Sequence, residues 1–379
     1  MIKVNVRNGQ IATDITFPCS EKDLSKALEK IDAADIYPPV LTVREVVFPD
    51  ELTELKGQNI DLDELNFLAK FMDSFDAKED ARFFAAAACE GFSTPKELIN
   101  LGMNLSRYSL IGDISDVSKI GWTYMLETKG ALPASDRENP KYAEIGRQLM
   151  SSGKGIYTDH GMLFIDENQP MQELYDGRNF PFYAYESDML LMVKAEYKGR
   201  TEYLCMPCED AAITKAMNRL GAPLSDEVSV TVEDCSFDSP EWFDRIKGMA
   251  KTDNIYAINA LSEALNNADQ NFAKLDAVME YADVSDAASI AALANSINHF
   301  IHIDDAQDLE DVGRFFIDNT PEYGLNPDLE DFFDYEKFGE HMDDENCGRF
   351  VSEGYVCMDS DHTLEEILDT DRGMKMGGM

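Results

Sequence analysis

The spacing of apolar positions differs between segments of this chain. Apolar and polar residues alternate over residues 2–6 and 228–232, which predicts strands. Between residues 65 and 75, apolar side chains recur three, seven and ten positions after Leu65, which predicts a helix with one buried stripe. The pattern therefore indicates short strands mixed with amphipathic helices.

Local start signals place several further helices. Ser93-Thr94-Pro95-Lys96-Glu97 is a capping box with proline at the first helical position, so a helix begins there. Ser285-Asp286 begins a counterpart, and short helices are predicted over residues 21–31 and 210–220. Helices over residues 122–128 and 142–149 then precede a hairpin whose corners are the glycines at 155 and 161.

Many of these signals occur twice, in the same order and at a nearly constant offset. The offset is 189 to 193 residues over about 140 positions, and self-similarity at a fixed period indicates repeated structural units. The equivalent positions are Pro18-Cys19 with Pro207-Cys208, Thr42-Val43 with Thr231-Val232, Phe48 with Phe237, Leu65, Asn66, Leu68 and Met72 with Ile258, Asn259, Leu261 and Leu265, Gly121 and Thr128 with Gly313 and Thr320, and Tyr142, Gly146, Gly155 and Gly161 with Tyr335, Gly339, Gly348 and Gly354.

The sequence thus predicts an α+β fold, an elongated tandem duplication of a three-part unit. Each unit would open with strands, at residues 2–6 in the first copy and 228–232 in the second. Each would contain a small antiparallel sheet domain, a helical middle domain and a mixed α+β C-terminal domain. The expected domains are residues 1–60, 61–112 and 113–168 in the first copy, and 183–250, 251–302 and 303–379 in the second. Residues 166–182, which contain Pro170, Gly177 and Pro181, are expected to link the copies.

Composition adds a large negative charge to this picture. The chain has 73 acidic and 33 Lys or Arg residues, a formal net charge of −40, yet 44% of its residues are hydrophobic, which is typical of a globular protein. Residues 1–176 have a net charge of −12, and residues 301–379 alone have −18. A need for solubility would explain many acids but not their concentration in one section.

The acidic residues of the last section are the candidate partner-binding surface. Duplex DNA carries one charge per ~1.7 Å of its axis, so forty negative charges match the phosphates of roughly 20 base pairs. Residues 328–336 are expected to form one helix with its apolar residues inward and its acids outward. The candidate residues are Asp304, Asp305, Asp308, Glu310, Asp311, Asp318, Asp328, Glu330, Asp331, Asp334, Glu336, Asp343, Asp344 and Glu345.

Catalytic, metal and cofactor motifs are weak by comparison. The sequence has no Walker A loop, G-x-G-x-x-G or G-x-S-x-G. His299 and His302 are spaced to share a metal, but surface or capping roles are favoured, and Cys205-x-x-Cys208 is more typical of buried thiols. Asp359-Ser360-Asp361 begins like a calcium loop but lacks the required glycine. We therefore expect no enzyme, no cofactor and no metal.

The third section of each copy resembles the ArdA-type antirestriction proteins. The resemblance rests on Phe315 through Thr320, Gly324-Leu325, Asp334 through Gly339 and Gly348 through Tyr355, with matching segments at Leu126 through Pro133, Tyr142 through Gly146 and Thr158 through Gly161. Thr16-Phe17-Pro18 before a short helix is also similar to that family.

The resemblance implies a DNA mimic of mobile genetic elements that occupies the DNA groove of a type I restriction-modification enzyme, at its methyltransferase core. It implies no direct nucleic-acid binding and a location in the host cytoplasm, which agrees with the scattered, odd number of cysteines and the lack of a signal peptide or membrane span. Family members are usually homodimers of one unit, so this chain would be a monomeric pseudo-dimer or a homodimer. The alternatives are inhibition of another nucleic-acid-binding complex, such as a CRISPR effector, and an acidic metal-binding protein or hydrolase.

Overall fold

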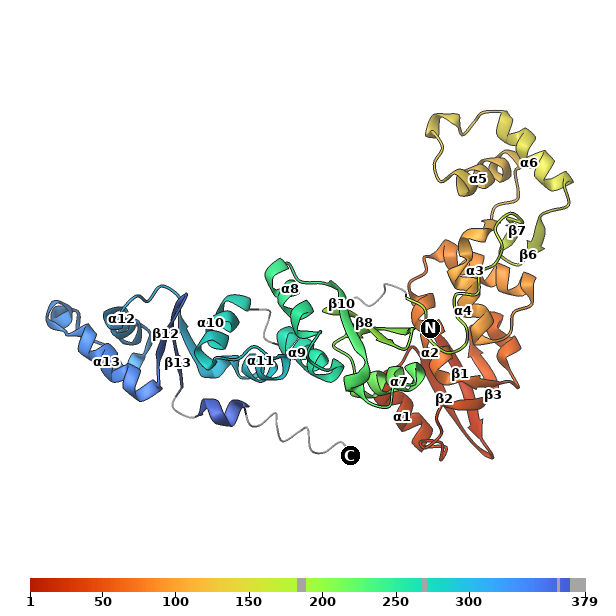
Figure 1. Ribbon diagram of the computed structural model, residues 1–379. Helices are drawn as coiled ribbons and strands as arrows, with labels where there is room; N and C mark the ends of the chain where they lie inside the picture. The colour runs from red at the N-terminus through yellow and green to blue at the C-terminus, as the bar shows by residue number, and fades with distance from the viewer. Residues whose placement is uncertain (183–188, 268–270, 360–361, 369–379) are drawn as a thin grey trace. The chain divides into compact units, whose positions relative to one another are not determined.

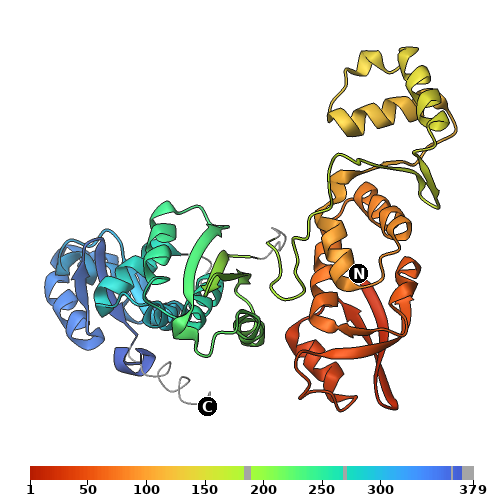
Figure 2. The ribbon, with the colours of Figure 1, turned by 45° about the vertical axis from the view of Figure 1, so that its right-hand side comes forward.

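The computed structural model describes residues 1–182, 189–267, 271–359 and 362–368, and the chain divides into two compact units, residues 1–185 and 186–379. Both units have an α+β fold with small antiparallel sheets, as predicted (Figure 1). In each unit a sheet, a group of helices and a smaller helix-and-sheet section follow one another, as the colours show in two views (Figures 1 and 2). The finer domain boundaries stay a prediction.

The first unit has a four-stranded sheet of order β2-β1-β3-β4 and a three-stranded sheet of order β5-β7-β6. Its strands are β1 Ile2–Asn8, β2 Ile11–Phe17, β3 Val40–Phe48, β4 Asn59–Asp61, β5 Tyr108–Ile111, β6 Ile156–Thr158 and β7 Gly161–Ile165. Its helices are α1 Glu21–Glu29, α2 Leu62–Asp73, α3 Ala77–Glu90, α4 Pro95–Met103, α5 Val117–Lys129 and α6 Lys141–Ser151, with 3₁₀ turns η1 Asp50–Leu55, η2 Leu105–Arg107 and η3 Ala134–Asp136.

The second unit has two three-stranded sheets of order β10-β8-β9 and β11-β13-β12. Its strands are β8 Leu191–Tyr197, β9 Arg200–Met206, β10 Ser229–Cys235, β11 Phe300–Ile303, β12 Arg349–Val351 and β13 Gly354–Met358. Its helices are α7 Asp210–Leu220, α8 Pro240–Met249, α9 Ile255–Asn267, α10 Phe272–Ala282, α11 Ala287–Asn295, α12 Leu309–Asn319 and α13 Tyr335–Asn346, with 3₁₀ turns η4 Ser225–Glu227, η5 Ile297–His299, η6 Pro321–Tyr323 and η7 Pro327–Phe332.

Apolar burial explains this division. In each unit one large core joins the first sheet to the middle helices, from Ile2 to Tyr175 in the first and from Leu190 to Ile367 in the second. A smaller core fills each third section, around Ile120 in the first unit and around Phe316 in the second. The third section of each unit therefore has packing of its own.

Positions predicted to be equivalent make the same contacts in both units. The Asn66 side chain accepts from the Cys19 backbone N–H at 2.9 Å and donates to the Cys19 carbonyl at 3.0 Å. Asn259 binds the backbone of Cys208 in the same way, at 2.9 and 2.8 Å. An amide group that satisfies both backbone groups of one residue fixes the first helix of the unit's middle section to the end of a strand hairpin. Tandem duplication itself stays a prediction.

Capping signals were located correctly. The Thr94 hydroxyl accepts from the Glu97 N–H at 3.3 Å and the Glu97 carboxylate accepts from the Thr94 N–H at 3.0 Å, which forms the predicted capping box of α4. Asp286 caps α11, as expected from Ser285-Asp286. A side-chain cap satisfies one of the backbone donors that a helix start leaves without an intrahelical partner, so these residues determine where each helix begins.

Two expectations about the chain's organisation need correction. The strand over residues 228–232 does not open the second unit: it belongs to β10, the third strand, and pairs with β8, whose hairpin with β9 opens the unit. The predicted linker, residues 166–182, is part of the first unit. Tyr175 within it is buried, and its backbone N–H donates to the Asn100 side chain at 2.9 Å.

Candidate partner-binding surface

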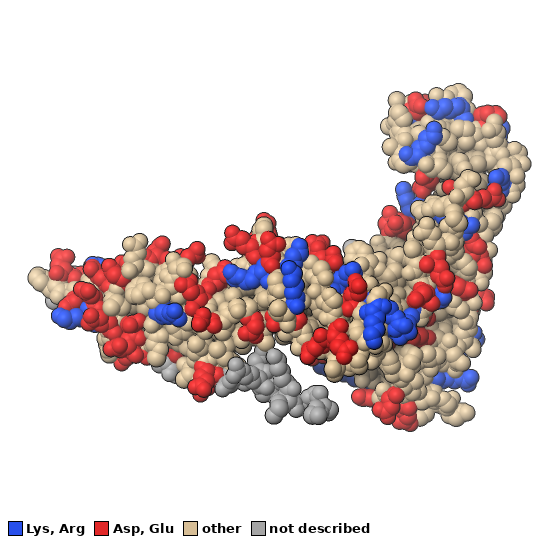
Figure 3. Space-filling view, viewed as in Figure 1, with Lys and Arg blue, Asp and Glu red and all other residues tan. Residues whose placement is uncertain are grey.

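The third section of the second unit is the most acidic part of the described chain. Residues 303–359 contain 18 acidic and three basic residues, a net charge of −15, whereas the corresponding residues 113–168 contain nine and six, a net charge of −3. Figure 3 shows acidic side chains over α12 and α13, with few basic ones among them. The two sections share an element order but not a charge.

Two packed helices support this section. The backbones of α12 and α13 approach through Gly313 and Gly339, where an added Cβ would overlap the backbone of the opposite helix. Val312, Phe316 and Met342 are buried in the small core next to this contact. Because the helices pack at this distance, their outward side chains project from a rigid base, which lowers the entropy lost when a partner binds.

Eight of the predicted site residues are exposed and have no cationic partner within 4.0 Å among the described residues. These eight are Asp304, Asp305, Asp318, Asp328, Glu330, Asp331, Glu336 and Asp344. We call them, together with Glu322 and Glu340, the acidic surface. Glu322 and Glu340 are exposed in the same section and belong with them, although the sequence prediction omitted them. Only the composition of the section indicated these two, because neither lies in a run of acids.

The other predicted site residues have structural contacts. Asp308 caps α12 by accepting from the Asp311 N–H at 3.1 Å, and the Asp311 carboxylate accepts from the Gln307 N–H at 2.9 Å. Glu310 pairs with Arg314 at 2.6 Å, and Glu345 lies 3.6 Å from His341. Asp308 and Asp311 stabilise the start of α12, and Glu310 is paired with a cation, so these three groups contribute less unpaired charge. Glu345 is paired with a charge only when His341 is protonated.

Asp343 is partly buried and serves the small core. Its carboxylate accepts from the Tyr355 hydroxyl at 2.8 Å, and Tyr355 is itself buried. Burial, reinforced by this hydrogen bond to a carboxylate, raises the pKa of Tyr355 well above its ordinary value. Tyr355 therefore stays a neutral donor, and Asp343 is unsuited to contact a partner.

The prediction of one helix over residues 328–336 was wrong. A 3₁₀ turn, η7, ends at Phe332, Phe333 is extended, and α13 begins at Tyr335. Asp334 separates the two elements because its side chain accepts from the Lys337 N–H at 3.2 Å and pairs with the Lys337 ammonium at 2.6 Å. These hydrogen bonds from Lys337 lower the pKa of Asp334. Phe332, expected to face inward, is 84% exposed.

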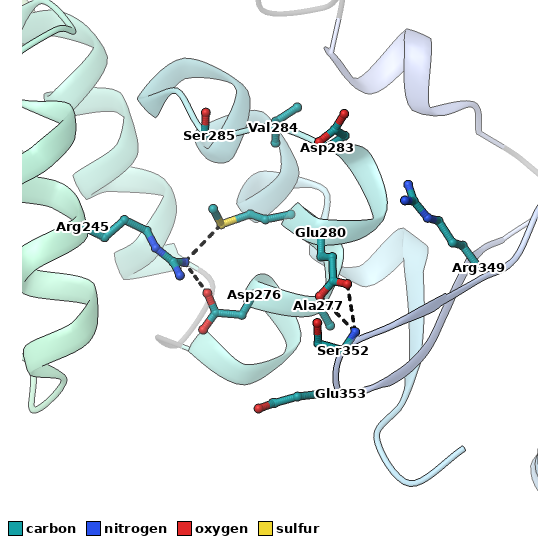
Figure 4. Close-up of a pocket in the computed structure, with 11 residues that line it drawn as sticks. Arg245, Asp276, Ala277, Glu280, Asp283, Val284, Ser285, Arg349, Ser352 and Glu353 are labelled. Atoms are coloured by element: carbon teal, nitrogen blue, oxygen red, sulfur yellow. Dashed lines mark hydrogen bonds and ion pairs between the residues drawn. The ribbon is translucent and has the colours of Figure 1, made fainter. Parts of the chain in front are cut away.

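A pocket of about 460 Å³ lies between α8, α10 and the β12–β13 hairpin (Figure 4). Arg245 at its edge pairs with Asp276, and Arg349 donates to a backbone carbonyl of α10. The Glu280 carboxylate accepts from the Ser352 N–H at 2.9 and 3.0 Å. Among the described residues that line the pocket there is no histidine.

The structure also describes most of the residues that the sequence analysis considered for metal or redox chemistry. His299 and His302 do not converge: the His302 Nε2 lies 2.7 Å from the Glu353 carbonyl oxygen, whereas the His299 Nδ1 lies 2.8 Å from Asp359 Oδ2. Cys205 and Cys208 form no disulfide. Of the suggested calcium loop, Ser360 and Asp361 lie outside the described residues. Within the part of the chain described, no helix is long and apolar enough to cross a membrane.

A comparison with known protein families matches the part of the chain that contains the acidic surface. Residues 198–357 match the family model described as antirestriction protein (ArdA), and this range contains the whole acidic surface. No curated protein matches the chain. The match supports an antirestriction function and an interaction with restriction enzymes in general. Residues 198–357 are therefore similar to the ArdA antirestriction family, and the match supports an ArdA-type protein.

Proposed function

We propose that this protein mimics B-form DNA and occupies the DNA groove of a type I restriction-modification enzyme in the host cytoplasm. The net charge of −15 over residues 303–359 is the observation that supports this proposal most strongly, because the same section of the first unit has only −3. A groove built for phosphates is lined with Lys and Arg, and carboxylates on a rigid base can replace the phosphates there.

Rigid carboxylates suit this role for two physical reasons. The acidic surface lies on α12, on α13, on the turns between them and, for Asp304 and Asp305, on the segment between β11 and α12. The packing of the two helices through Gly313 and Gly339 holds their backbones in place. Long-range attraction between opposite charges raises association rates, and this effect weakens as salt is added. The inhibitor would therefore bind fast and lose affinity steeply with ionic strength.

The test compares two charge-reversed variants of the full chain. One replaces Asp328, Glu330 and Asp331 by Lys on the acidic surface, and the other replaces Asp35, Glu138 and Asp159, which are exposed in the first unit. Both change the formal net charge from −40 to −34, so they differ only in where the charge is changed. Asp334 is kept because its reversal would also remove the cap of α13.

The measurement is competition between each variant and a labelled cognate duplex for a purified type I methyltransferase core. We expect the surface variant to compete at least about tenfold less well than the control variant, because three phosphate-like charges near the groove are reversed. Equal competition by both variants would show that bulk charge, not the acidic surface, is recognised. If the parent protein displaces no duplex from this core but displaces nucleic acid from a CRISPR effector, that effector would be the target of the mimic. Metal-dependent hydrolysis by the parent protein would reject mimicry.

The number of units in the active species is a further part of the proposal. One chain contains two units whose elements follow a similar order, apart from β4 in the first and α8 in the second, so we propose that it acts as a monomeric pseudo-dimer. Light scattering at the concentration of the competition assay tests this, and a mass near twice 42.5 kDa would instead indicate a homodimer.

A further inference from the structure

Three metal-ligating side chains converge at one end of the sheet β11-β13-β12. His299 is the last residue of η5, directly before β11, and Asp359 directly follows β13. Phe300 pairs with Met358 in the antiparallel ladder, and the Asp359 N–H donates to the His299 carbonyl at 2.9 Å. The ladder therefore places the two side chains together, with His299 Nδ1 2.8 Å from Asp359 Oδ2.

His362 reaches the same place by a second route. It precedes a short helix over residues 364–368, where the Thr363 N–H donates to the Glu366 carboxylate at 2.9 Å and the Glu366 N–H donates to the Thr363 hydroxyl at 3.2 Å. Ile367 in this helix is buried against the large core of the second unit. The His362 Nδ1 consequently lies 3.4 Å from Asp359 Oδ1, and the two imidazole rings are 3.8 Å apart.

We propose that His299, Asp359 and His362 bind one Zn²⁺ ion or a similar borderline transition-metal cation. One ligand atom from each residue lies within 4.8 Å of the others. Zinc bonds of about 2.0–2.2 Å in a tetrahedron place ligand atoms roughly 3.3–3.5 Å apart, so side-chain shifts on the order of 1 Å would close the site.

The ligand set selects the class of ion. Two imidazoles with one carboxylate suit Zn²⁺, Co²⁺, Ni²⁺ or Cu²⁺, whereas Ca²⁺ and Mg²⁺ require more oxygen ligands. Three protein ligands leave one coordination position for water. The three side chains are 37 to 42% exposed, so an ion can enter from solvent, and the negative charge of the chain raises the local concentration of cations.

A bound ion would cross-link two segments of the second unit. It would join the start of β11 to the segment after β13, and so fix the short helix over residues 364–368 on the core. Any ion that binds the folded chain more tightly than the unfolded chain stabilises the fold. Zinc would therefore raise the melting temperature of the second unit.

The experiment titrates the full chain, first treated with chelator, with ZnCl₂ by calorimetry, and repeats the titration with Co²⁺ as an optical probe of the coordination geometry. We expect one site per chain whose affinity falls at least about tenfold in His362→Gln and in Asp359→Asn. His302→Gln is the matched control, since His302 lies in β11 near the cluster but contacts the Glu353 carbonyl instead. It should bind zinc as the parent does.

Two results would overturn the proposal. Equal zinc affinity in His362→Gln and His302→Gln would show that the ion binds surface carboxylates rather than this cluster. No zinc binding by the parent would show that the three side chains form hydrogen bonds only. Circular dichroism of each variant without metal establishes that it is folded, and His299→Gln provides a second ligand variant if either of the others is not.

Discussion

The closest backbone approach in the acidic section gives a sharp test of its packing. A Cβ on Gly313 of α12 would lie 3.0 Å from the Gly339 N of α13 and closer still to the Tyr335 carbonyl oxygen, inside the 3.0 Å limit that real Cβ atoms respect. Gly248 in α8 is the matched control, because no atom lies within 4 Å of the Cβ that would be added there. We therefore compare Gly313→Ala with Gly248→Ala.

The two substitutions are chemically identical but should have opposite effects. Alanine is favoured over glycine in a helix by about 1 kcal/mol, and Gly248→Ala should approach that gain. At Gly313 the obstacles are backbone atoms that cannot rotate away, so α12 and α13 must separate. Overpacking typically costs about 1–3 kcal/mol, and the upper end applies here, which leaves a net loss of about 2 kcal/mol after the helix gain.

Amide hydrogen exchange measured on peptides from α12 and α13 detects this loss locally. Since each 1.4 kcal/mol is a factor of ten, about 2 kcal/mol should accelerate exchange roughly thirtyfold in Gly313→Ala. Peptides from the equivalent helices α5 and α6 should exchange as in the parent. If the α12 amides of Gly313→Ala exchanged no faster than those of the parent, the two helices would not be in backbone contact. They would then not form a rigid base for the acidic surface.

Three further predictions concern single contacts. Asn259→Ala should lower the free energy of unfolding by about 1–3 kcal/mol in urea denaturation, because a backbone N–H and a backbone carbonyl lose their partner. Burial raises the pKa of Cys357 to about 12, so iodoacetamide should modify exposed Cys347 in the native protein and spare Cys357 until the chain unfolds; equal labelling would contradict this. The hydrogen bonds from Ser352 lower the pKa of Glu280. The stabilisation they give is therefore present above the ordinary carboxyl pKa and is lost as the pH falls through the lowered value. Hydrogen exchange of the β12–β13 turn should accelerate in acid, and Glu280→Gln should remove this pH dependence.

Local signals in the sequence located α1, α2, α4, α5, α6, α7 and α11, whereas α3, α8, α10 and α12 were not predicted. Thr94 and Glu97 define the start of α4 by two hydrogen bonds that involve only neighbouring residues, and Asp286 does the same for α11. The helix boundary near Asp334 was missed for a related reason. The apolar and acidic residues around Asp334 match a helical repeat, which favours one continuous helix. The Asp334 side chain can instead cap a new helix that begins at Tyr335, and the residue pattern alone does not distinguish these two outcomes.

Contacts between distant segments were beyond sequence reasoning. The pairing of His299 with Asp359 depends on the register of β11 against β13, which joins residues 60 positions apart. Spacing along the chain instead suggested His302, whose ring contacts the Glu353 carbonyl. The hairpin of β8 and β9 was also missed. The clear alternation of apolar and polar residues at 228–232 predicted β10 instead as the opening strand of the second unit.

A comparison of the two units separates what the fold requires from what it does not. Gly121 and Gly146 in the first unit make the same close helix contact as Gly313 and Gly339 in the second, so these positions are constrained by packing. The acidic surface has no such constraint, since its side chains are exposed and the equivalent section of the first unit has a net charge of only −3. Mutual repulsion among these carboxylates opposes folding. A charge that the fold neither needs nor benefits from is best explained by a partner outside the chain, which supports mimicry over a structural role for the acids.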